Sequence, residues 1–147
     1  MRYNLLLIAV LIMLLIVIKT AHAEPVINMD VIHKIESSNG LDKSAYVLDR
    51  YAIGKHQVSR GALQEYNERY GTKYTVKDLL DDEINYNIAT WYANVRSLEL
   101  LRAYHIPITR NNMLACYNIG IGNLIRKKEQ QALQKYINKY EKYSTSI

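Results

Sequence analysis

The chain has 147 residues, with 19 Lys and Arg against 14 Asp and Glu, and it contains a single cysteine. The mild positive charge does not fit a dedicated nucleic-acid binder, and one cysteine excludes an internal disulfide framework. The length suffices for one domain with a real hydrophobic core and not for two. Four scattered histidines form no ligand cluster, so we expect neither a metal nor a cofactor: they are His22, His33, His56 and His105.

Residues 1–23 have the pattern of a secretory signal peptide. Arg2 gives a short positive start, residues 5–18 form an uninterrupted apolar run, and a small-x-small cleavage pattern ends at Ala23. An apolar run of 14 residues is shorter than the about 20 that span a bilayer. We therefore expect cleavage after Ala23 and export to the periplasm or the extracellular cell wall.

The alternative for this segment is an uncleaved signal anchor, which would hold the protein at the membrane. Lys19, directly after the apolar run, favours that alternative slightly. In both cases residues 24–147 form one domain, and without Arg2 and Lys19 its net charge is +3. We expect this domain to be a monomer.

The first predicted helix follows Pro25, which suits a first helical position. Ile27, Val31 and Ile35 recur at every fourth residue, and Asn39-Gly40 supplies a stop. Further helical segments with recognisable caps or apolar faces are predicted at 59–71, 75–80, 82–104, 109–120 and about 123–143.

One segment departs from the helical pattern. Residues 45–58 are rich in Tyr, Val and Ile and are interrupted at Gly54, which favours a short β-hairpin. The predicted fold class is therefore mainly α, with one small β excursion. The chain also has 13 Tyr and no Phe. Because a buried phenol needs a hydrogen-bond partner, we expect many of these rings along a rim or groove.

Glu36, at the end of the first predicted helix, is the candidate acid–base catalyst. It faces the negative end of the helix dipole, which disfavours a carboxylate. Ile32 and Ile35 place it at the border of an apolar surface, where desolvation acts in the same direction. We expect the pKa of Glu36 to be raised to about 6, as in other glycosidase acids.

Other motifs accompany Glu36 along the chain: they are IESS at 35–38, AIGKHQVS at 52–59, LLDDEINYNIATWYANV at 79–95 and CYNIGIGNL at 116–124. In order and spacing they resemble the lytic transglycosylase domain of the soluble-lytic-transglycosylase type. That family has a Glu-Ser pair at a helix end, a Gly-x-x-Gln loop and an Ala-Tyr-Asn-x-Gly motif. The resemblance covers residues 28–124.

The resemblance implies an α+β, lysozyme-like fold whose cleft binds a peptidoglycan glycan strand. Glu36 takes the position of the family's catalytic acid and base. Ser37 matches a serine that contacts the substrate near the scissile bond. The implied reaction cleaves the β-1,4 bond between N-acetylmuramic acid and N-acetylglucosamine without water and leaves a 1,6-anhydro end.

Four further residues match the family's cleft. Gly54 and Gln57 match the loop that lines it. Tyr117 matches the tyrosine whose hydroxyl orients the catalytic glutamate, and Asn118 matches the cleft asparagine beside it. Three residues depart from the pattern: Lys55 and His56 replace apolar residues of the loop, so the subsite they line differs, and Cys116 replaces a small alanine.

Two other functions remain open. A hydrolase resembling goose-type lysozyme would need a second carboxylate to position water, for which Asp49 is the best candidate and Asp42 a weaker one. A non-catalytic module would bind glycan through its Tyr rings within an envelope-spanning machine. Enzymes of this build often serve a secretion, conjugation or pilus apparatus, so components of one are candidate partners.

Overall fold

The structure is a computed structural model that describes residues 24–146, a mainly helical domain with one two-stranded sheet. Its elements in chain order are α2 (Met29–Ser37), the 3-10 turn η1 (Lys43–Tyr46), β1 (Ala52–Ile53), β2 (Val58–Ser59), α3 (Arg60–Tyr70), the 3-10 turn η2 (Val76–Leu80), α4 (Asp82–Trp91), the π-helical turn η3 (Tyr92–Arg96), α5 (Ser97–Ala103), α6 (Arg110–Asn118), α7 (Ile121–Ile125) and α8 (Gln130–Ser144). The predicted class, mainly α with a small β excursion, is confirmed.

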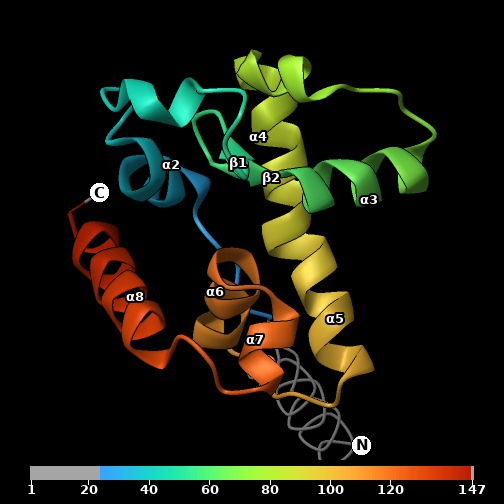
Figure 1. The fold of residues 1–147 in the computed structure, drawn as a ribbon. Coiled ribbons are helices and arrows are strands. Elements are labelled where there is room, and N and C mark those ends of the chain that lie inside the picture. Colours follow the sequence, from blue (N-terminus) through green and yellow to red (C-terminus); the bar gives the residue numbers. More distant parts are fainter. Residues whose placement is uncertain (1–23, 147) are drawn as a thin grey trace, which may run out of the picture.

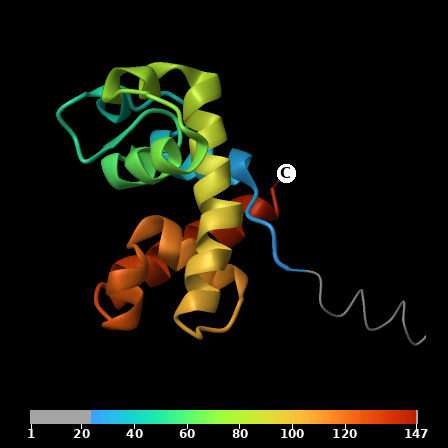
Figure 2. The ribbon, with the colours of Figure 1, turned by 90° about the vertical axis from the view of Figure 1, so that its right-hand side faces the viewer.

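The helices α4 and α5 continue each other through η3 and form the long axis of the domain (Figure 1). The hairpin, η1, η2 and α3 surround its first half, while α6, α7 and α8 lie beside its second half. Figure 2, turned by 90°, shows the same two groups above and below each other along this axis. The predicted signal peptide, residues 1–23, lies outside the described residues. Between residues 24 and 146, no helix combines the length and the apolar character that a membrane crossing requires.

Local caps set several helix boundaries as predicted. The Ser59 hydroxyl accepts a hydrogen bond from the Ala62 amide at 3.1 Å and starts α3, which ends at Gly71 with φ +67°. A capping box joins Thr75 and Asp78 at η2. Thr109 caps α6 in the same way as Ser59 caps α3. Each cap satisfies amide groups that have no partner inside the helix.

Two predicted helices have different bounds. The first begins at Met29 and not at Pro25, because the Asn28 side chain accepts from the Asp30 amide at 2.9 Å and caps α2 there. The predicted last helix is divided into α7 and α8. Lys127 and Glu129, between these helices, have φ values of +52° and +59°, which helical backbone does not allow.

The predicted hairpin is shorter than the 45–58 segment. Its strands have two residues each, paired antiparallel as Ala52 with Ser59 and Ile53 with Val58. Part of the preceding stretch forms the 3-10 turn η1 (Lys43–Tyr46) instead, which Asp42 caps by accepting from the Ser44 amide at 2.9 Å. Asp42 therefore has a local structural role.

Asn85 on α4 fixes the turn of the hairpin to the helical axis. Its side chain is buried and donates to the carbonyl oxygens of Ile53 and Leu79 at 2.8 and 3.0 Å. Its Oδ1 accepts from the His56 amide at 3.0 Å. Gly54 lies directly against this side chain, with φ +83°, and a Cβ there would lie 2.2 Å from Asn85 Nδ2. Only glycine fits this position without displacing Asn85.

The apolar core lies where α2, α4, α5, α6 and α8 meet. Its fully buried side chains include Ile32, Ile88, Leu101, Met113, Leu114 and Cys116, and the α8 residues Leu133, Ile137 and Tyr140 are buried as predicted. Burial raises the pKa of the Cys116 thiol to about 11. A thiol that stays protonated and buried contributes packing and not reactivity.

Candidate active site

Glu36 lies in the last turn of α2 and is half-buried. Its Oε1 accepts a hydrogen bond from the Tyr136 hydroxyl at 2.7 Å. Burial raises the pKa of Glu36 from 4.5 to about 7, although the Tyr136 hydrogen bond and the charge of Lys139 both act in the opposite direction. The sequence predicted this direction from the helix dipole and desolvation together, and in the structure desolvation is the largest cause. The carboxyl group can both hold and release a proton near neutral pH.

The sequence did not identify Tyr136, which comes from α8, 100 residues after Glu36. Burial and the neighbouring Glu36 keep the pKa of its phenol well above 10, so it remains a neutral hydrogen-bond donor. One signal was present in the sequence. Tyr136 lies three residues after Leu133 and next to Ile137, on the inward stripe of α8, where a phenol must find a partner.

The predicted hydrogen bond from Tyr117 to Glu36 is wrong. The Tyr117 hydroxyl donates instead to the carbonyl oxygen of His56 at 2.5 Å. Burial first, and the charge of Glu36 second, hold the pKa of Tyr117 well above 10. Tyr117 is therefore close enough to Glu36 for the two to interact electrostatically, while its hydroxyl holds the hairpin to α6.

The predicted contact of Ser37 with substrate is also wrong for this structure. The Ser37 side chain is fully buried. Its hydroxyl donates to the His33 carbonyl oxygen and accepts from the Gly40 amide, both at 3.1 Å. These bonds close the turn that follows α2, so the hydroxyl acts on the backbone beside Glu36 and not on a ligand.

Gln57 holds the hairpin turn in a strained conformation. Its φ is +50°, and its side-chain amide donates to the carbonyl oxygens of Ala45 and Gly54, each at 3.0 Å. Gln57 also lines a small hollow together with Tyr92 and Tyr117. The structure thus brings Gln57 and Tyr117 to the same small hollow.

The departures from the family pattern have structural explanations here. Lys55 Nζ lies 2.5 Å from the Asp82 carboxylate. His56 is buried, and its ring contacts His33 and Tyr86, with centroid separations of 5.5 and 5.6 Å. His56 therefore packs beneath the hairpin, and the expectation that it lines a subsite is wrong. Within residues 24–146, no three His, Cys, Asp or Glu side chains come together as metal ligands.

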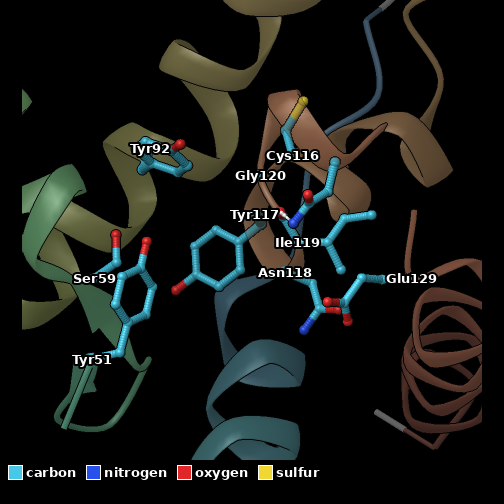
Figure 3. A pocket seen from close by; sticks show the side chains of 10 residues that line it. Tyr51, Ser59, Tyr92, Cys116, Tyr117, Asn118, Ile119, Gly120 and Glu129 are labelled. Atoms are coloured by element: carbon cyan, nitrogen blue, oxygen red, sulfur yellow. Dashed lines mark hydrogen bonds between the residues drawn. The ribbon is translucent and has the colours of Figure 1, made fainter. Parts of the chain in front are cut away.

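A hollow of about 290 Å³ lies between the hairpin and the end of α6 (Figure 3). Its lining residues are Tyr51, Ser59, Tyr92, Cys116, Tyr117, Asn118, Ile119, Gly120, Asn123 and Glu129. The predicted cleft residues Tyr117 and Asn118 thus face a common space. Glu36 does not line this hollow, whereas Tyr117 does, and the charge of Glu36 acts on the Tyr117 phenol.

Of the acidic residues Asp49 and Glu129, only the second lines this hollow. Asp49, the predicted second carboxylate, is exposed in the turn between η1 and β1 and does not line it. Glu129 does line it. The sequence did not identify Glu129, because the run Lys-Lys-Glu-Gln at 127–130 resembles the solvated face of a continuous helix.

No protein-family model, no curated protein and no solved structure matches this chain.

Proposed function

We propose that the protein is a peptidoglycan lytic transglycosylase with a lysozyme-like fold. The observation that supports this proposal is the environment of Glu36: burial raises its pKa to about 7, and its only hydrogen-bond partner among the described side chains is the neutral phenol of Tyr136. A carboxyl group that performs both a protonation and a deprotonation needs a pKa near the working pH.

The proposed reaction uses this one group twice. Tyr136 donates to Oε1 of Glu36, so Oε2 carries the mobile proton. In the first step Oε2 donates that proton to the leaving glycosidic oxygen, and the C1–O bond of N-acetylmuramic acid breaks. The acetamido oxygen of the same sugar stabilises the positive charge at C1. In the second step the carboxylate takes the proton of the C6 hydroxyl, whose oxygen bonds to C1 and closes the 1,6-anhydro ring.

Tyr136 supports both steps. Its phenol remains protonated because its pKa lies well above 10. It therefore donates a hydrogen bond to the glutamate in either protonation state, and this bond is stronger when the acceptor is a carboxylate. The phenol stabilises the intermediate charge on Glu36 without forming a salt bridge that would hold the group ionised.

The hollow supplies the sugar-binding surface in this proposal. The rings of Tyr51, Tyr92 and Tyr117 line one part of it, and the amides of Asn118 and Asn123 line another. Aromatic faces pack against the apolar faces of sugar rings, and amides bond their hydroxyl and acetamido groups. A glycan strand bound there would pass Tyr117, which lies near Glu36. In the cell, such an enzyme would act on the wall after export, and components of a secretion, conjugation or pilus apparatus are candidate partners.

The test is product analysis. The protein is incubated with purified peptidoglycan and the released fragments are weighed. Anhydro-muramoyl ends would support the proposal, reducing ends would indicate hydrolysis, and binding without release would indicate a scaffold. Glu36→Gln is expected to lower release at least a hundredfold, whereas Glu141→Gln, on the exposed face of α8, should act like the wild type. Release by Glu36→Gln at a rate near that of the wild type would contradict the site assignment.

A further inference from the structure

Among residues 24–146, Glu129 is the only charged residue that lines the 290 Å³ hollow. Every other lining residue is aromatic, aliphatic, amide, hydroxyl or thiol in character. In Figure 3 the Glu129 carboxylate extends toward Asn118 and faces the same space as the ring of Tyr117. The hollow therefore presents a single negative charge beside amide and aromatic groups.

The backbone around Glu129 is held in a fixed and unusual conformation. Its φ of +59° lies in the left-handed region, which costs a residue with a side chain about 1–2 kcal/mol. The bend is secured on both sides. The Lys128 amide donates to the Asn123 carbonyl oxygen, and the Leu133 amide donates to that of Glu129, both at 2.9 Å. The surrounding hydrogen bonds thus fix the position of the Glu129 backbone from which its side chain extends.

The Glu129 carboxylate is also available to a ligand. Between residues 24 and 146 no ion pair includes it, although Lys127 and Lys128 are its neighbours in sequence. It caps no amide of α8 either. The carboxylate forms neither an ion pair nor a helix cap among the described residues, and it lies at the wall of a hollow. Its oxygens can therefore accept hydrogen bonds from a ligand.

We infer that Glu129 is a specificity-determining residue of the sugar subsite. Its carboxylate accepts hydrogen bonds from ring hydroxyls. Because none of the described lining residues is a cation, this carboxylate disfavours a sugar with an acidic substituent and favours one with an ammonium group. Hydrogen bonds to a charged acceptor are about twice as strong as neutral ones, and repulsion of like charges adds selectivity. The hollow would thus take an N-acetylglucosamine ring, or its deacetylated form, and exclude a ring with a free carboxylate. This inference rests on the proposed function for the identity of the glycan.

The test compares two probes, tri-N-acetylchitotriose and its deacetylated form, the glucosamine trimer. Isothermal titration of full-length wild-type protein, Glu129→Gln and Glu141→Gln gives the six dissociation constants. We expect Glu129→Gln to weaken the acetylated trimer about tenfold and the glucosamine trimer by a larger factor, because the latter also loses a charge pair. Glu141→Gln, a change of the same charge on the same helix, should leave both values unchanged.

Three results in these titrations would overturn the inference. In one, Glu129→Gln binds both trimers within twofold of the wild type. In another, neither trimer binds to the wild type. Equal weakening of both probes would also contradict it, since a general structural effect does not distinguish an ammonium from an acetamide. A thermal denaturation midpoint equal to that of the wild type confirms that the variant is folded.

A second measurement separates this inference from the proposed function. With soluble glycan strands as substrate, Glu129→Gln should raise KM about tenfold and leave kcat within twofold. If the wild type releases nothing from peptidoglycan while the trimers bind as expected, the proposed reaction is contradicted and the proposed sugar subsite is supported. If the wild type releases anhydro products and Glu129→Gln has an unchanged KM, the proposed reaction is supported and the proposed role of Glu129 is contradicted.

Discussion

The substitution Glu36→Gln is expected to stabilise the fold at alkaline pH and to leave it unchanged in acid. The folded protein binds the proton of Glu36 more tightly than the unfolded chain does, because burial raises the pKa from 4.5 to about 7. The stability of the wild type is therefore full below pH 4.5 and falls as the pH rises to about 7, where the buried carboxyl group ionises. The difference between the two pKa values corresponds to about 3 kcal/mol.

Glutamine is a close substitute at this position. Its amide oxygen can accept the hydrogen bond that the Tyr136 hydroxyl donates at 2.7 Å, but it has no charge to bury. The variant should thus lack the decline in stability between pH 4.5 and 7 that Glu36 causes. At pH 8 its free energy of unfolding should exceed that of the wild type by about 2–3 kcal/mol, and at pH 4 the two should agree within about 0.5 kcal/mol.

Urea denaturation followed by circular dichroism at pH 4, 6 and 8 measures these free energies. The control is Glu141→Gln, which removes an exposed carboxylate from α8 and should follow the wild type at every pH. If the curves for Glu36→Gln and the wild type are parallel from pH 4 to pH 8, Glu36 is hydrated in solution. Such a result would contradict the assignment of Glu36 as a desolvated acid.

Two further substitutions test the contacts around the site. Tyr136→Phe removes the hydrogen bond that favours the carboxylate form of Glu36. The pH at which the rate of glycan release falls on the alkaline side should therefore rise by about one unit. An unchanged pH dependence would contradict this. Gly54→Ala, at φ +83° and with its Cβ 2.2 Å from Asn85 Nδ2, should lower the free energy of unfolding by about 2–4 kcal/mol in urea denaturation. Gly61→Ala, on α3 with no atom nearer than 3.9 Å, is its control and should not be destabilised.

The sequence predicted the parts of the fold that depend on neighbouring residues. Ser59, Thr75 and Thr109 each cap a helix within three residues of themselves, so their effect can be recognised locally. The break between α7 and α8 could not be predicted in this way. Lys127 and Glu129 adopt left-handed backbone there without a glycine or proline to mark the bend. Bonds to α7 and α8 impose it.

The candidate site could likewise be predicted only in part from the sequence. The sequence predicted that desolvation raises the pKa of Glu36, and burial of the carboxyl group in the folded chain does raise it. The identity of its phenol partner depends on which of 13 tyrosines the fold brings near, and the family resemblance favoured Tyr117. In the folded chain the Tyr117 hydroxyl is taken by the His56 carbonyl oxygen, while α8 packs against α2 and brings Tyr136 to the carboxyl group.

The helix α8 connects the proposed chemistry with the proposed specificity. It begins directly after Glu129, the charged residue that lines the hollow, and seven residues later it carries Tyr136, which donates a hydrogen bond to Glu36. Seven residues are about two turns, or roughly 10 Å of helix, so both groups belong to one rigid segment. A change that displaces α8 as a whole would therefore alter KM and the pH dependence of kcat together. Removing the charge of Glu129 alone alters only KM, and this difference separates a contact with substrate from a general disturbance of the site.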